Sequence, residues 1–121
     1  MTMNDKARRL LAGETIVSRE PGNSMTPKLQ SRQPVRLAPC FWHQAEKGDI
    51  VYCRVRGNFY THLVLATNEE KGVLIGNNHG RTNGWTKNVF GRVVEIMPMD
   101  WKEPQAPAKR KSLGPDVGNC Q

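Results

Sequence analysis

The sequence of 121 residues lacks any apolar run near the roughly 20 residues that a membrane-spanning helix needs. Its first residues are basic but include no apolar stretch of the secretory type. We therefore expect a cytoplasmic protein without a membrane span. Apolar residues make up only 37% of the chain, which indicates that part of it does not pack into a core. No internal repeat is visible, and the length fits one domain.

Cysteine is also scarce, with three residues, Cys40, Cys53 and Cys120. An odd number in a chain without a secretory signal favours reduced thiols over a disulfide framework. Cys40 and His43 have the spacing of half a zinc site, but zinc needs a second close pair of ligands and Cys53 stands alone. The sequence thus predicts neither a metal nor an organic cofactor.

Charge is not concentrated in any segment. The net charge is +7, from 18 basic and 11 acidic residues, yet no block of five or six like charges occurs. Aromatic residues, 7% of the chain, do not alternate with basic ones as in nucleic-acid-binding modules. A soluble basic surface is therefore the favoured interpretation, and a nucleic-acid-associated accessory protein remains an alternative.

What the chain does contain is a series of short β patterns, in which apolar residues alternate between turn signals. The expected strands lie at 14–20, 34–39, 46–57 (after an initial turn), 58–68, 72–78 and 89–97. The hairpin turn is expected at Gly57-Asn58, and Gly91 predicts a bulge or a close approach inside the last strand. A single short helix is expected at residues 4–12, with Asn4 as its N-cap.

These elements predict three parts of the chain. Residues 1–13 form an N-terminal arm or short helix, 14–97 a β domain, and 98–121 a flexible, disordered tail that holds four of the eight prolines. The fold class is mostly β, a small coiled or partly closed β structure with almost no helix.

The segment GNSMTP, residues 22–27, places Ser24 in a tight turn. Ser24 is either a turn residue or a nucleophile, and a serine nucleophile needs a base from elsewhere in the fold. His62 lies within an apolar strand, where a histidine must be hydrogen-bonded or functional. His43 and His79 lie in segments that read as loops. Ser24 and His62 are therefore the candidate pair.

Five segments, in the order GNSMTP, KGDIVYCRV, FYTHLVLA, GVLIGNN and VFGRVVEI, resemble the LexA/signal peptidase superfamily. Those proteins show a G-x-S-M-x-P nucleophile motif, a G-D-I-V strand, a strand with the general base, an asparagine-bearing segment and a closing G-x-V-V strand. The resemblance covers roughly residues 14–97. It implies a coiled, mostly β peptidase fold of the LexA/signal peptidase type, with Ser24 as the nucleophile.

Branches of this family differ in the base. LexA-type repressors and bacterial signal peptidases have a lysine there, whereas archaeal and endoplasmic-reticulum-type signal peptidases have a histidine before a short apolar run. The run Thr61-His62-Leu63-Val64 looks like the histidine branch, which implies that His62 is the base. That branch has an acidic third residue in a segment after the base strand. Here the corresponding segment, IGNNHGRTNGW, contains asparagines but no Asp or Glu. Asn77 or Asn83 is expected to orient His62 without stabilising its cation, so the site should be slow or inactive.

The resulting expectation is a soluble serine peptidase-like protein that hydrolyses a peptide bond of a polypeptide substrate with a Ser24–His62 dyad. The alternative is an inactive member that acts as a binding or regulatory module. The twenty residues before the site hold neither a helix-turn-helix nor a membrane anchor, which argues against a repressor and a conventional signal peptidase. The sequence does not decide whether cleavage occurs in cis, at Ala12-Gly13, or in trans. It also leaves open a phage origin and the oligomeric state.

Overall fold

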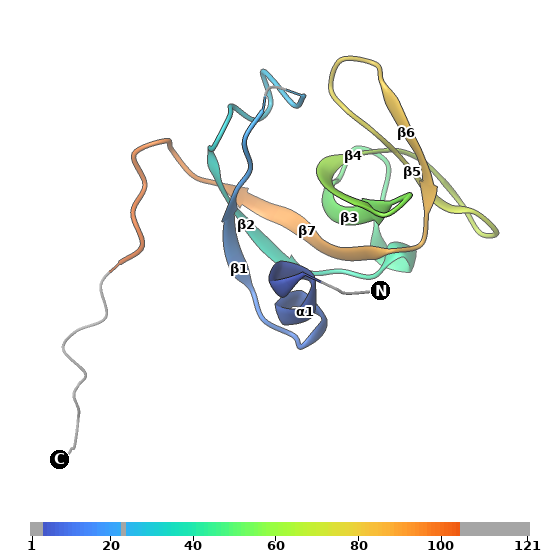
Figure 1. Ribbon diagram of the computed structural model, residues 1–121, viewed down its shortest axis with the longest axis horizontal. Coiled ribbons are helices and arrows are strands. Elements are labelled where there is room, and N and C mark those ends of the chain that lie inside the picture. The colour runs from blue at the N-terminus through green and yellow to red at the C-terminus, as the bar shows by residue number, and fades with distance from the viewer. Residues whose placement is uncertain (1–3, 23, 105–121) are drawn as a thin grey trace, which may run out of the picture.

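The computed structural model describes residues 4–22 and 24–104 (Figure 1). Within these ranges the chain forms one α-helix, one 3-10 turn and seven strands. Their bounds are α1 Asp5–Leu11, β1 Ile16–Arg19, β2 Pro34–Pro39, η1 Trp42–Gln44, β3 Ile50–Val55, β4 Asn58–Asn68, β5 Gly72–Gly76, β6 Thr82–Thr86 and β7 Val89–Ile96. The mostly β fold class is confirmed, and each of the six predicted strands is present. In this part of the chain no helix has the length and apolar character to cross a membrane.

The described strands form one antiparallel sheet in the order β1-β2-β7-β3-β4-β5-β6. Strand β7 pairs with both β2 and β3, and so joins the β1–β2 part to the β3–β6 part (Figure 1). Strand β6, at the edge of the sheet, also contacts β3, so this end of the sheet curls back on itself. The predicted coiled and partly closed shape follows from that contact.

A two-residue turn connects β3 to β4. Val55 pairs with Asn58, so the turn residues are Arg56 and Gly57, at φ of 53° and 85°. Two successive positive φ angles are typical of a type I′ turn, whose twist matches that of the strands. The hairpin is therefore confirmed, one residue earlier than the predicted Gly57-Asn58.

Alternation along β3 divides the core into two clusters. Tyr52 packs with Ala7 and Leu10 of α1 in the cluster beneath the helix. Val51 and Cys53 point to the opposite face and pack inside the curled β3–β6 part. The period-two pattern of a strand requires this division.

Gly91 of β7 shows both predicted features. The register between β3 and β7 shifts beside it, since Tyr52 pairs with Gly91 whereas Cys53 pairs with Val89. A Cβ atom at this position would lie only 2.9 Å from Cδ1 of Leu10. The glycine therefore allows α1 to approach the sheet closely.

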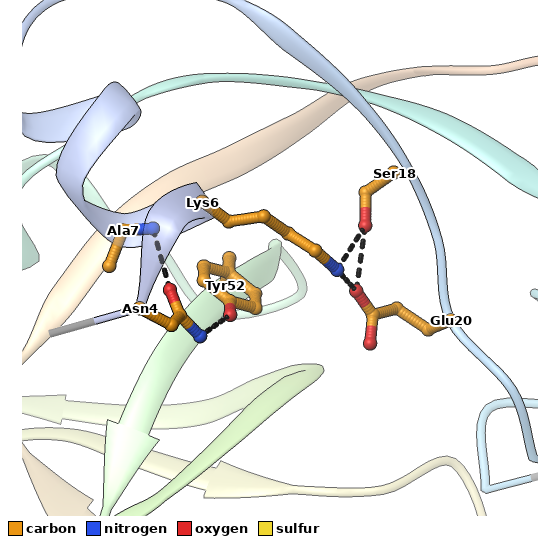
Figure 2. Close-up of polar contacts among 6 residues, drawn as sticks. All are labelled: Asn4, Lys6, Ala7, Ser18, Glu20 and Tyr52. Atoms are coloured by element: carbon orange, nitrogen blue, oxygen red, sulfur yellow. Dashed lines mark hydrogen bonds and ion pairs between the residues drawn. The ribbon is translucent and has the colours of Figure 1, made fainter.

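Polar side chains attach α1 to the sheet (Figure 2). Asn4 caps the helix, because its Oδ1 accepts a 2.8 Å hydrogen bond from the amide of Ala7, while its Nδ2 donates to the hydroxyl of Tyr52. Lys6 donates to Ser18 Oγ at 2.8 Å and forms an ion pair with Glu20. The helix therefore holds the segment that leads from β1 to Ser24.

The seventh strand, β6, was not predicted. Its sequence, TNGWT, has no apolar alternation and contains Gly84, which weakens a strand. Pairing with the buried strand β5 orders it, with Ile75 opposite Gly84 and Val73 opposite Thr86. Tertiary pairing thus outweighs a weak local preference.

The chain makes further contacts with the sheet after β7. The carbonyl of Trp101 accepts a 2.7 Å hydrogen bond from Arg19, and the guanidinium of Arg36 lies 5.9 Å from the centre of its ring. The segment that follows β7 therefore packs against β1 and β2 through Trp101. The rest of the predicted tail, 105–121, lies outside the described residues.

The two described cysteines are buried free thiols. Burial raises the pKa of Cys53 to about 12, and it also raises the pKa of Cys40. Such thiols behave as small apolar core groups. The third cysteine, Cys120, lies outside the described residues.

Candidate active site

Ser24 lies in the loop between β1 and β2. The loop turns at Gly22, whose φ of 106° favours glycine, and the peptide bond between Thr26 and Pro27 is cis. Ser24 is half-buried, whereas the next residue, Met25, is only 4% exposed and packs in the cluster beneath α1. Met25 therefore fixes the loop in the core directly after the serine.

His62 lies on β4 and faces Ser24. The distance from Ser24 Oγ to His62 Nε2 is 2.9 Å, a hydrogen bond between residues 38 positions apart. The ring of His62 stacks on that of Tyr60 with 4.8 Å between the ring centres, and His62 is 8% exposed. Strand alternation brings these two rings to one face, so the imidazole has a fixed plane.

The far side of the imidazole contacts β6. Asn83 Oδ1 lies 2.7 Å from His62 Nδ1. An amide oxygen accepts, so Nδ1 carries the proton and Nε2 presents its lone pair to Ser24. Three separate elements therefore contribute one continuous chain of hydrogen bonds.

Of the two asparagines expected to orient His62, the structure places Asn83 against the ring. The side chain of Asn77 accepts hydrogen bonds from the amides of His79 at 2.8 Å and Arg81 at 3.0 Å. Asn77 lines the same groove as Ser24 and shapes the loop between β5 and β6. Its contribution to the site is thus loop geometry.

The pKa of His62 lies below its ordinary value. Burial is the larger cause, because it disfavours the charged ring, and the hydrogen bond that His62 donates to Asn83 opposes it. His62 is consequently neutral at pH 7, which is the state that accepts a proton from serine.

Asn78 is a site residue that the sequence reasoning did not single out. Its backbone amide donates to the carbonyl of Ser24 at 2.9 Å, and its Nδ2 donates to the carbonyl of Thr26 at 2.9 Å. The loop between β5 and β6 therefore fixes the serine loop from the other side. The only signal in the sequence was its position after a buried strand.

The Ser24–His62 pair opens onto a groove of about 360 Å³, which has Tyr60, Arg81 and Asn83 in its walls. A second cavity of about 30 Å³ adjoins it, and both are lined by Ser24 and Thr61. The groove provides the access that a nucleophile needs.

Other candidate groups have different surroundings. Asp49 accepts a 2.8 Å hydrogen bond from the amide of Glu46 and lies 3.6 Å from Arg92, so it stabilises the turn before β3. A larger hollow of about 500 Å³, beside Trp42 and His43, contains none of the predicted site residues. Within residues 4–22 and 24–104, no three His, Cys, Asp or Glu side chains gather as metal ligands.

Compared with family models, with curated proteins and with solved structures, the chain has no significant match. Its function must therefore be inferred from the geometry of its own residues.

Proposed function

We propose that the protein is a serine peptidase in which Ser24 is the nucleophile, His62 the general base and Asn83 the residue that orients His62. One observation carries this proposal: the hydrogen bonds of 2.9 Å and 2.7 Å that join Ser24, His62 and Asn83 beside an open groove. A nucleophile, a base within reach and a third group that holds the base are the parts that acyl transfer needs. The resemblance of the GNSMTP segment to the LexA/signal peptidase superfamily supports the same assignment.

The chemistry would follow from these positions. Ser24 Oγ attacks the carbonyl carbon of the substrate while its proton passes to His62 Nε2. The C–N bond then breaks, and the leaving amine takes that proton from His62. The acyl group remains on Ser24 until water attacks it, with His62 again as the base. The product acid leaves, and Ser24 regains its proton.

An amide in the third position limits the rate. Asn83 fixes the tautomer and plane of His62, but it carries no charge to stabilise the imidazolium that forms during attack. Burial of His62 adds to the cost of that cation. Turnover is therefore expected to be slow compared with sites that have a carboxylate.

The same observation favours a second candidate function. A groove that binds a polypeptide, with a base too poorly supported for turnover, would act as a binding or regulatory module. Both candidates place a polypeptide segment in the groove beside Ser24, and they differ in whether Ser24 reacts.

Labelling with a fluorophosphonate tests the peptidase proposal without a known substrate. The expected result is one covalent adduct on Ser24, found by peptide mass mapping, and no adduct in Ser24→Ala. A matched control is Ser31→Ala, since Ser31 Oγ accepts a hydrogen bond from Gly22 and does not contact His62. Wild-type protein that stays unlabelled would favour the binding module.

A further inference from the structure

The groove beside Ser24 has few charged groups in its lining. Glu20 and Arg81 are the residues of the lining that carry a charge at pH 7, because burial keeps the ring of His62 neutral. The other polar groups are neutral, among them the hydroxyl of Thr61, which is buried and has no hydrogen-bond partner in the described part of the chain. The charge that a ligand meets in the groove therefore depends on Glu20 and Arg81.

The two charges differ in whether they are already paired. The carboxylate of Glu20 forms an ion pair with Lys6 and accepts a 2.7 Å hydrogen bond from Ser18, as Figure 2 shows. By contrast, no acidic side chain of residues 4–22 and 24–104 forms an ion pair with Arg81. The groove therefore presents an uncompensated positive charge.

The backbone of Arg81 is held in place while its side chain is exposed. Its amide donates to Asn77 Oδ1 at 3.0 Å, and its carbonyl accepts from the amide of Asn77 at 2.9 Å. A guanidinium can bind a carboxylate with two parallel hydrogen bonds, a geometry that an ammonium cannot match. Arg81 is thus suited to bind a carboxylate in the groove.

A second arginine lies against the wall of the groove. Arg54 on β3 pairs with Phe59 on β4, and its guanidinium lies 5.4 Å from the centre of the Phe59 ring, which lines the groove. In the described ranges Arg54 has no ion pair with an acidic side chain either. A guanidinium stacked on a ring can still donate hydrogen bonds from its edge. Two cations without an acidic partner therefore border the groove.

The aromatic residues of the groove favour a peptide over a nucleic acid as the anionic ligand. Phe59 contacts Tyr52 as well as Arg54, and Tyr60 stacks on His62. Single-stranded nucleic acids bind by stacking their bases on available aromatic rings, and these two rings already stack within the protein. A carboxylate side chain needs only the guanidinium.

We propose that the groove binds an acidic polypeptide segment, in which Arg81 holds a glutamate or aspartate side chain and Arg54 favours a further acidic residue. The net charge of +7 attracts the same segment over a longer range. The inference rests on the proposed function, because the segment bound in the groove is the one that Ser24 would attack.

Binding to the Ser24→Ala protein tests the charge preference separately from turnover. The probes are three pools of heptapeptides, acetylated and amidated at their ends, in which the randomised residues are uncharged except for one glutamate, glutamine or lysine. The amides of Tyr60 and Asn83, followed by NMR, report occupancy of the groove. At low salt the glutamate pool should bind about 3- to 10-fold more tightly than the glutamine pool, and the lysine pool should bind most weakly.

Variants at Arg81 assign the preference to one side chain. Adding Arg81→Gln should reduce the glutamate preference below about 2-fold, and Arg81→Glu should make the lysine pool the tightest binder. A gain of lysine binding cannot come from a variant that fails to fold. The control is Lys71→Gln, which removes one positive charge at the opposite end of β5, where Lys71 lies over the Trp85 ring. It should leave the preference unchanged.

Equal affinity for the glutamate and glutamine pools, or a preference that survives Arg81→Gln, would overturn the inference. Tighter binding of a short oligothymidylate than of the glutamate pool, if lost in Arg81→Gln, would also overturn it and identify a nucleic acid as the ligand. Phosphonate labelling of the wild-type protein, run in parallel, separates the two proposals. Labelling without a glutamate preference rejects the acidic segment and leaves the peptidase intact. A preference that depends on Arg81 in a protein that does not label supports the acidic segment and rejects the nucleophile.

Discussion

Two serine-centred hydrogen-bond networks lie in this molecule, and they differ in charge. At the first, Ser18 donates to Glu20 at 2.7 Å and accepts from Lys6 at 2.8 Å (Figure 2). At the second, Ser24 faces His62, whose other nitrogen faces Asn83. The first network consists of a paired cation and anion around a serine, and the second contains only neutral groups at pH 7.

The difference explains why one serine is structural and the other a candidate nucleophile. Ser18 is 4% exposed, and its proton is bonded to Glu20 while a charged ammonium occupies its lone pair. A neutral base is what Ser18 lacks. Ser24 has one in His62, and it borders the groove. A serine reacts when it has both a neutral base and access to substrate.

The largest expected effect comes from removing the base of the second network. His62→Ala should lower the rate of peptide hydrolysis at least about 100-fold, as loss of a general base does. Ser24→Ala should be equally damaging, and the double variant no worse than either, since the two residues act as a unit. Hydrolysis of a peptide pool, followed by mass spectrometry, measures all three. Effects that add in the double variant would contradict a shared mechanism.

Adding charge to the second network should sharpen the comparison. Asn83→Asp places a carboxylate on His62 Nδ1 and should raise kcat on the order of 10-fold or more. The carboxylate stabilises the imidazolium and so raises the pKa of His62. His62 then needs a higher pH to be neutral, so the acidic limb of the pH–rate profile should move to higher pH.

Asn77→Asp is the matched control for this charge. It introduces the same carboxylate into the same groove, and its oxygens can still accept from His79 and Arg81. The acidic limb should move less than in Asn83→Asp. An equal shift in both variants would mean that contact with His62 is not the cause.

Removing charge from the first network should lower the free energy of unfolding and should not change the rate of phosphonate labelling at Ser24. Lys6→Met breaks the ion pair with Glu20 and the hydrogen bond to Ser18, at a cost of about 1 kcal/mol of unfolding free energy, because the pair is partly exposed to solvent. Urea denaturation measures the loss. A fall in the phosphonate labelling rate of more than about 10-fold would show that the two networks are coupled.

The smallest effect concerns pH and stability. Burial lowers the pKa of His62 in the folded protein, so the unfolded chain binds more protons than the fold as pH falls through about 6.5. Stability should therefore decrease below that pH. His62→Gln should flatten this part of the curve, as followed by thermal unfolding across buffers. An unchanged slope would assign the pH dependence to other groups.

Alternation and turn residues were enough to predict six strands and the helix cap at Asn4. The same reasoning selected Ser24 and His62, because a histidine within an apolar strand is rare without a partner. These features are local, because each depends on residues that are close together in the sequence.

The remaining parts depend on pairing between distant segments. Strand β6 has a polar sequence, so nothing local predicts that Asn83 rather than Asn77 would face His62. Asn78 holds the serine loop through backbone carbonyls, which leave no mark on the sequence. The unpaired hydroxyl of Thr61 likewise emerges only from packing.

The central claim is that neutral His62 activates Ser24, and the pH dependence of phosphonate labelling tests it most directly. Across about pH 5 to 9, the labelling rate at Ser24 in the wild-type protein should rise through one ionisation with a pKa below the ordinary histidine value and then level off. In His62→Ala the labelling at Ser24 should be lost. Labelling of Ser24 that is undiminished in His62→Ala, or that shows no ionisation in this range, would contradict the account.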